Sequence, residues 1–157
     1  MRIGRTLLVA SVTLAVCGTT GYALAKTRPL AGGAAIVGLG GRCLDVNQSG
    51  TRNGTAVQLW ECNDTGAQQW SAGANSSLRA LDKCLDVRSS GKADGTPVQL
   101  WQCNGTGAQK WQAGASGSLV NPQSGRCLDD PGGTATDGTQ LQIWDCNGGS
   151  GQSWTRT

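Results

Sequence analysis

The chain has 157 residues, with 13 basic and 10 acidic side chains and no histidine, so its net charge at pH 7 is +3. This length allows one domain of ordinary size and little else. The basic residues are scattered rather than gathered into a stripe, which argues against nucleic acid or an anionic membrane surface as a partner.

Residues 1–25 have the pattern of a secretory signal peptide. Arg2 and Arg5 form a basic start, residues 7–16 are apolar, and residues 23–25 read Ala-Leu-Ala, a typical cleavage site. We therefore expect cleavage after Ala25 and secretion of the mature protein. A membrane span fits less well, because polar residues and glycines interrupt the apolar run. Acylation of Cys17 is a further alternative, but Val16 is larger than the residue that usually precedes such a cysteine.

Six cysteines remain after this cleavage, and they fall into three pairs with the same separation of 19 residues. The pairs are Cys43 with Cys62, Cys84 with Cys103, and Cys127 with Cys146. An even number of cysteines in an exported protein suggests disulfides. Six cysteines allow 15 connectivities, but the constant separation favours one local pair in each segment.

The mature chain repeats itself three times with a period of about forty residues. We expect a linker over residues 26–33 and one domain over residues 34–157, with repeats at about 34–72, 73–113 and 114–157. Apolar and polar residues alternate at 56–60, 98–101 and 141–144, which predicts strands, and Ser-Gly, Asn-Gly and Asp-Gly pairs predict turns. We therefore expect an all-β, pseudo-threefold domain of about twelve short strands, because no forty-residue segment buries its own apolar face.

Each repeat ends in the motif Gln-x-Trp, at residues 68–70, 109–111 and 152–154. Together with the recurring Cys-Leu-Asp and Gln-Leu/Ile-Trp-x-Cys-Asn, these motifs resemble the ricin-type β-trefoil lectin family, also grouped as family 13 carbohydrate-binding modules. The resemblance covers nearly all of the mature chain. It implies a β-trefoil, a barrel capped by hairpin triplets, with one shallow sugar site in each repeat.

The six tryptophans form two equivalent sets. Those that close the repeats, Trp70, Trp111 and Trp154, are expected to fill the core. Those beside the second cysteine of each repeat, Trp60, Trp101 and Trp144, are expected to be aromatic platforms for a sugar ring, with burial in the core as the alternative.

Four kinds of polar residue complete the expected sugar sites. By resemblance, Asp45, Asp86 and Asp129 accept hydrogen bonds from sugar hydroxyls, with a turn role as the alternative. Gln58, Gln99 and Gln142 share a strand face with the platform and are either secondary contacts or solvated strand positions. Asn63, Asn104 and Asn147 are rim contacts or plain turn residues. Gln68, Gln109 and Gln152 resemble residues that orient the aspartate.

The chain departs from the family pattern just before the last glutamine of each repeat. Many sugar-binding members have an asparagine there, whereas this chain has Ala67, Ala108 and Gly151. One direct hydrogen bond to the sugar is therefore absent from each expected site. The third repeat also reads Asp129-Asp130-Pro131 where the other two repeats have Asp-Val.

The residues argue against an enzyme. There is no histidine for acid–base or metal chemistry, Glu61 is the only glutamate, and the recurring aspartates are spread one to a repeat. We expect no cofactor or metal, and a secreted monomer that binds oligo- or polysaccharides of galactose, arabinose or xylose type. The alternatives are a protein-interaction or inhibitor role on the same scaffold, or an accessory subunit of a separately encoded glycoside hydrolase.

Overall fold

The computed structural model describes residues 33–157, so the expected signal peptide, Cys17 and most of the expected linker lie outside the described residues. Within this range the chain is all-β, with twelve short strands. They are β1 (Ile36–Val37), β2 (Cys43–Val46), β3 (Thr55–Trp60), β4 (Ser71–Ala72), β5 (Leu78–Ala80), β6 (Lys83–Val87), β7 (Thr96–Trp101), β8 (Gln112–Ala113), β9 (Leu119–Asn121), β10 (Arg126–Asp129), β11 (Gln142–Trp144) and β12 (Thr155–Arg156).

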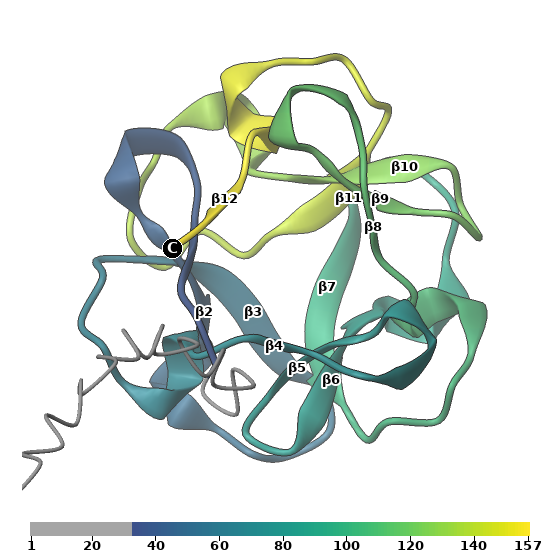
Figure 1. Ribbon diagram of the computed structural model, residues 1–157. Coiled ribbons are helices and arrows are strands. Elements are labelled where there is room, and N and C mark those ends of the chain that lie inside the picture. The colour runs from purple at the N-terminus through teal and green to yellow at the C-terminus, as the bar shows by residue number, and fades with distance from the viewer. Residues whose placement is uncertain (1–32) are drawn as a thin grey trace, which may run out of the picture.

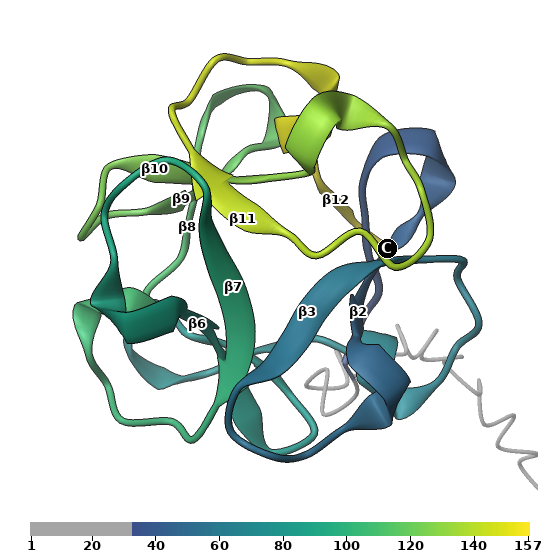
Figure 2. The same ribbon diagram turned by 180° about the vertical axis from the view of Figure 1, so that it is seen from behind.

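The strands build three similar lobes around a common centre (Figures 1 and 2). In each lobe one long antiparallel hairpin dominates: β2 with β3, β6 with β7, and β10 with β11. The second strands of these hairpins also pair with one another, β3 with β7 and β7 with β11. An isolated bridge between Gln58 and Gln140 joins the β11 segment to β3 and closes the ring. The predicted β-trefoil is confirmed.

Short 3-10 turns connect the strands. They are η1 (Leu39–Gly41), η2 (Asn47–Ser49), η3 (Gly66–Gln68), η4 (Ala74–Ser76), η5 (Arg88–Ser90), η6 (Gly107–Gln109), η7 (Ala115–Gly117), η8 (Pro131–Gly133) and η9 (Ser150–Gln152). Two of them, η2 and η5, directly follow the first strand of a long hairpin, and η8 follows β10 after one residue, Asp130. Over residues 33–157, no helix has the length and apolar character needed to cross a membrane.

The core lies on the common axis and is made of equivalent residues from the three repeats. Its fully buried side chains include Leu44, Leu85 and Leu128 from the first strands of the hairpins. The tryptophans that close the repeats are also buried, as predicted. Each donates its indole N–H to a leucine carbonyl in the first strand of its hairpin, for example Trp70 Nε1 to Leu44 O at 2.8 Å. This bond satisfies a polar atom that would otherwise be buried without a partner.

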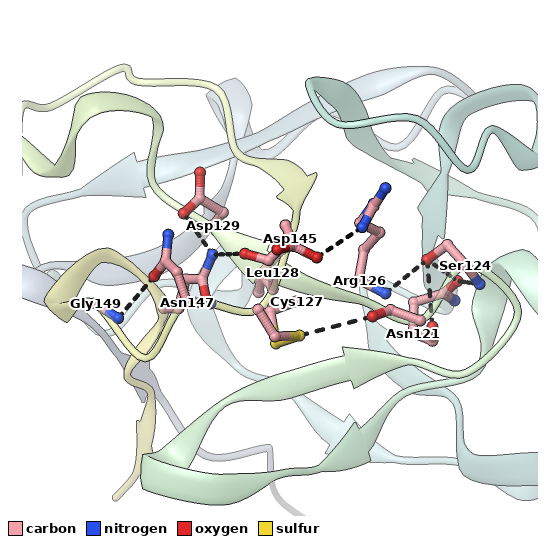
Figure 3. Close-up of a disulfide and its surroundings, with 12 residues drawn as sticks. Asn121, Ser124, Arg126, Cys127, Leu128, Asp129, Asp145, Asn147 and Gly149 are labelled. Carbon is pink, nitrogen blue, oxygen red and sulfur yellow. Dashed lines mark hydrogen bonds and ion pairs between the residues drawn. A yellow bond between two sulfur atoms is a disulfide. The ribbon is translucent and has the colours of Figure 1, made fainter.

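Disulfides tie each hairpin to the loop that follows it. The bonds are Cys43–Cys62, Cys84–Cys103 and Cys127–Cys146, the pairing that the constant spacing favours. Figure 3 shows the third of them, with Asp129 and Asn147 on one side of Cys127 and the ion pair of Arg126 with Asp145 on the other. The disulfide therefore lies directly beside the residues expected to bind sugar.

Contacts between repeats come from equivalent positions in each. The basic residue before the first cysteine reaches a polar residue in the hairpin turn of a neighbouring repeat. Arg42 lies 3.2 Å from Asp137, Lys83 Nζ donates to Asn53 Oδ1 at 3.0 Å, and Arg126 Nε lies 2.8 Å from Asp94. These exposed contacts contribute little energy individually, but they set the same docking geometry at all three junctions.

Candidate functional site

Each repeat carries one open hollow on its surface, between the long hairpin, the 3-10 turn after the first strand, and the loop after the second cysteine. In the first repeat Asp45, Gln58, Trp60 and Asn63 line a hollow of about 460 Å³. The equivalent sets are Asp86, Gln99, Trp101 and Asn104, around about 400 Å³, and Asp129, Gln142, Trp144 and Asn147, around about 560 Å³. The structure thus brings together four of the five predicted residues in every repeat.

The aspartate forms the buried floor of each hollow and is held by two glutamines. Gln58 Nε2 donates to one oxygen of Asp45 and Gln68 Nε2 to the other, both at 3.0 Å. The corresponding distances are 2.9 and 3.0 Å at Asp86, and 2.8 and 3.1 Å at Asp129. A carboxylate has about four acceptor positions. Two positions on each aspartate therefore remain for donors of a ligand.

Burial changes the acidity of two of these aspartates. Asp45 and Asp86 are each 5% exposed. Desolvation raises the pKa of both carboxyl groups above the ordinary value of 3.8, against the opposing effect of the glutamine hydrogen bonds. At neutral pH both remain acceptors for a ligand hydroxyl.

Two of the three hairpin glutamines are not solvated strand positions, and the third, Gln142, is half-buried. Gln58 and Gln99 are buried, since their amides are turned to the aspartates across the β2–β3 and β6–β7 pairs. The alternative of a solvated position is therefore wrong for these two residues. The physical reason is that Asp45 lies directly opposite Gln58, and Asp86 opposite Gln99, in the strand register.

Gln68, Gln109 and Gln152 hold the aspartates from behind and do not line these hollows. Besides its bond to Asp45, Gln68 donates to the Glu61 carbonyl at 2.9 Å and accepts from the Asn63 amide at 2.8 Å. Its side chain therefore joins the aspartate to the loop that carries Asn63. The other two repeats have the same set of bonds. These bonds fix the position of the aspartate, which is the geometry that the predicted orienting role requires.

The second set of tryptophans is the exposed one. Trp60, Trp101 and Trp144 are 40%, 36% and 40% exposed. Burial in the core, the alternative for these residues, is wrong. Each ring also lies next to a glycine from the hairpin turn of another repeat: Gly138 at Trp60, Gly54 at Trp101 and Gly95 at Trp144. Gly138 also lines the first hollow, which is therefore completed by the third repeat.

The asparagines after the second cysteine combine the two roles considered for them. The side-chain oxygen of Asn63 accepts from the Thr65 amide at 3.2 Å and from the Thr65 hydroxyl at 2.8 Å, which is a turn role. The same side chain lines the hollow. Since its oxygen is used by the loop, Asn63 has its NH₂ group to offer to a ligand. Asn104 makes the same two bonds, to Thr106.

Sequence reasoning missed the 3-10 turn that forms one wall of each hollow. Its first residue is Asn47, Arg88 or Pro131 in the three repeats, and each of these lines its hollow. A signal was available, because this position always lies two residues after the recurring aspartate. It was overlooked because its residue type differs in every repeat.

The third hollow also contains a second carboxylate. Asp130 is 2% exposed, and its Oδ2 accepts from the Ala135 amide at 3.1 Å. Among residues 33–157, its Oδ1 has no hydrogen-bond partner. Burial, with a contribution from Asp129, raises the pKa of this carboxyl group. The divergent Asp-Asp-Pro sequence therefore makes the third hollow the most acidic.

The positions that lack the usual asparagine behave in two ways. Ala67 and Ala108 are buried and pack in the apolar core, so they contribute no polar atom to a hollow. Gly151 lines the third hollow, which is the largest of the three. None of these three positions therefore supplies the side-chain hydrogen bond that the usual asparagine would offer.

A family model of the ricin-type beta-trefoil lectin domain matches residues 33–155. The chain belongs to this family. The lectin domain is also similar to a designed threefold-symmetric protein, ThreeFoil, at 28% identity and a TM-score of 0.72, over 79% of this chain and 96% of the other. This similarity agrees with the threefold repetition of its own strands and hollows.

Two plant proteins are similar as well. One is the agglutinin from Abrus precatorius, at 28% identity and a TM-score of 0.72, over 78% of the lectin domain's chain and 47% of the agglutinin. The other is a non-toxic homologue of type II RIPs from Momordica charantia, bitter gourd, in complex with alpha-methyl-D-galactoside. It matches at 27% identity and a TM-score of 0.71, over 78% and 46% of the two chains. The lectin domain's chain thus spans about half the length of these plant proteins.

Proposed function

We propose that the chain is a secreted, non-catalytic protein that binds galactose-, arabinose- or xylose-type sugars, free or within polysaccharides, through up to three shallow sites. The observation that carries this proposal is the same arrangement in all three repeats: an exposed tryptophan ring beside a buried aspartate that two glutamines hold. The Momordica homologue, whose structure contains a galactoside, supports a sugar ligand for this fold.

The chemistry of each hollow suits a pyranose. One face of such a ring presents C–H groups, which pack on the exposed face of Trp60 or its equivalents. Hydroxyls on adjacent carbons then donate to the free acceptor positions of Asp45, in charge-assisted hydrogen bonds. The NH₂ group of Asn63 supplies a donor at the rim. Apolar and polar contacts are therefore arranged as one sugar ring requires.

The same geometry supports a binding role for the aspartates rather than a catalytic one. Glycoside hydrolysis uses two carboxyl groups that flank one scissile bond. In the first and second hollows a single aspartate forms the floor, and both of its oxygens accept from glutamines. In the third hollow both Asp129 and Asp130 line the wall. Both oxygens of Asp129 accept from glutamines, and Asp130 Oδ2 accepts from the Ala135 amide.

The test is a retention screen of the purified protein on galactans, arabinans and xylans. We compare the wild type with a Trp60→Ala/Trp101→Ala/Trp144→Ala variant, which removes exposed rings and leaves the core intact. The proposal expects wild-type retention on at least one polymer and a loss of tenfold or more in the variant, since stacking and burial of each ring contribute roughly 1–2 kcal/mol.

Two further variants complete this test. Asp45→Asn/Asp86→Asn/Asp129→Asn is expected to lose binding as well, because each new NH₂ group replaces an acceptor. Asp64→Asn changes an exposed aspartate outside the three hollows and serves as the matched control. Circular dichroism checks that each variant is folded. Failure of the wild type to bind any carbohydrate, or full binding by the folded tryptophan variant, overturns the proposal.

A further inference from the structure

The three repeats differ sharply in charge although their folds are equivalent. Residues 34–72 carry two basic and three acidic side chains. Residues 73–113 carry five basic and three acidic side chains, and residues 114–157 carry two basic and four acidic ones. The net charges are therefore −1, +2 and −2. The described domain as a whole is nearly neutral, so its second repeat is a local basic region on an otherwise acidic surface.

The charge difference extends into the hollows themselves. At the first position of the 3-10 turn the first hollow has Asn47, the second has Arg88 and the third has Pro131. The second hollow therefore combines the negative charge of Asp86 with a positive charge. In the first and third hollows, no basic side chain lines the wall to offset the aspartates.

Arg88 is positioned to meet a ligand in this hollow. Its Nε donates to Gln99 Oε1 in a long hydrogen bond of 3.4 Å, while Gln99 Nε2 donates to Asp86. This contact uses one nitrogen of the guanidinium group and leaves the two terminal NH₂ groups. Within residues 33–157, the ion pairs of arginine are those of Arg42 and Arg126, and Arg88 has none. A guanidinium group that has no ion pair and two available NH₂ groups is suited to paired hydrogen bonds with a carboxylate.

A second, smaller hollow continues the basic surface. It measures about 220 Å³ and is lined by Arg79 and Lys110, and it shares Thr106 with the hollow of Arg88. A polymer that leaves the Arg88 hollow across Thr106 therefore meets two more positive charges. The positive charge of the second repeat therefore continues beyond the Arg88 hollow.

We propose that the hollow of the second repeat binds carboxylated sugar units, such as the uronic acids of an acidic polysaccharide, and that Arg88 selects their charge. The inference rests on the proposed carbohydrate-binding function and adds a ligand class for one of its three sites. Trp101 packs against the ring, Asp86 accepts from its hydroxyls, and Arg88 donates to its carboxylate. The first and third hollows take neutral sugars.

The experiment compares one polymer in two charge states, polygalacturonate and its carboxyl-reduced form. The measured quantity is the ratio of the dissociation constants for the neutral and the charged polymer. We expect the wild type to prefer the charged polymer and Arg88→Asn, which copies the first repeat, to lower the ratio by about threefold or more, the size of an exposed ion pair. Lys92→Asn removes an exposed charge of the same repeat outside the hollows and should keep the wild-type ratio.

A second variant tests whether the guanidinium group alone is enough to create the charge preference. Asn47→Arg places the guanidinium group at the equivalent position of the first repeat and should raise the ratio by a similar factor. All of these differences should shrink in 0.5 M salt, because the screening length between exposed charges falls to roughly 4 Å at that ionic strength. Equal wild-type affinity for the two polymers, or an equal effect of Lys92→Asn and Arg88→Asn, overturns the inference. The proposed function still stands in that case if both polymers bind, and it falls together with the inference if no carbohydrate binds.

Discussion

Asp45 and Asp86 are the residues of the first two hollows whose ionisation we expect to affect both binding and stability. Asp45 and Asp86 are buried, and burial raises the pKa of each above 3.8. A raised pKa means that the fold favours the protonated carboxyl group. The stability gained from protonation is fully present below the ordinary pKa and is lost as pH rises through the raised one. Binding has the opposite dependence, because only the ionised form is a full acceptor.

We therefore predict that affinity for a neutral sugar falls on acidification before the fold is lost. Isothermal titration from pH 7 to pH 3.5 should show weaker binding with a midpoint above 3.8. Titration of Asp45 and Asp86 contributes no loss of thermal stability over the same range, and melting curves at each pH check this. An affinity that does not change down to pH 3.5, in a protein that stays folded, contradicts this role of the carboxylates.

The long hairpin with its disulfide is the element that carries each site. In the first repeat, Cys43 pairs with Trp60 across β2 and β3, and the disulfide joins β2 to the loop that begins at Cys62 and carries Asn63. The platform, the aspartate and the asparagine thus depend on one hairpin and one covalent bond. The same holds for β6 with β7 and for β10 with β11.

Replacing one disulfide, as in Cys84→Ala/Cys103→Ala, should lower the free energy of unfolding by about 3 kcal/mol, the loop-closure value for a 19-residue separation. Urea denaturation measures this loss. The equivalent double variants at Cys43/Cys62 and Cys127/Cys146 are internal controls, since the loops have the same length. A loss of unfolding free energy below about 1 kcal/mol in all three double variants would contradict this prediction. It would show that the unfolded chain is already restricted between the two cysteine positions without the disulfide.

The whole molecule is a closed ring of three equivalent lobes (Figures 1 and 2). Each lobe carries one of the three hollows. Each hollow is open and shallow, and such sites typically bind at about the millimolar level, near −4 kcal/mol. A polysaccharide that reaches more than one hollow binds the second as an intramolecular event, which increases avidity without any new contact. We therefore expect polymer recognition to be a property of the assembled trefoil rather than of one repeat.

We predict that the wild type binds a polysaccharide at least about tenfold more tightly, per sugar unit, than the matching monosaccharide. Trp60→Ala/Trp144→Ala, which leaves one platform, should lose most of this advantage and keep measurable monosaccharide binding. Affinity electrophoresis and titration give the two constants. Comparable affinities of the wild type for monosaccharide and polymer count against simultaneous use of the hollows.

Much of the site could be predicted because its residues recur at a constant spacing. The recurrence identified Asp45, Trp60, Asn63 and their equivalents, and the difference between the two tryptophan sets. It did not identify Arg88, because the equivalent positions hold Asn47 and Pro131 and no pattern repeats there. It also could not place Gly138 beside Trp60, because those residues are in different repeats and 78 positions apart in the chain.

The sequence by itself indicated an all-β domain of three repeats and favoured the local disulfide pairing, and its resemblance to the lectin family implied the β-trefoil and the residue types of each site. The repeats and the pairing follow from local spacing, since cysteine pairs, strand alternation and turn residues act within forty residues of one another. Only the tertiary structure decided which faces are buried, that Gln58 and Gln68 hold one aspartate from two sides, and that the three hollows differ in charge. Those properties depend on the packing of hairpins and turns against neighbouring repeats, which linear spacing does not specify.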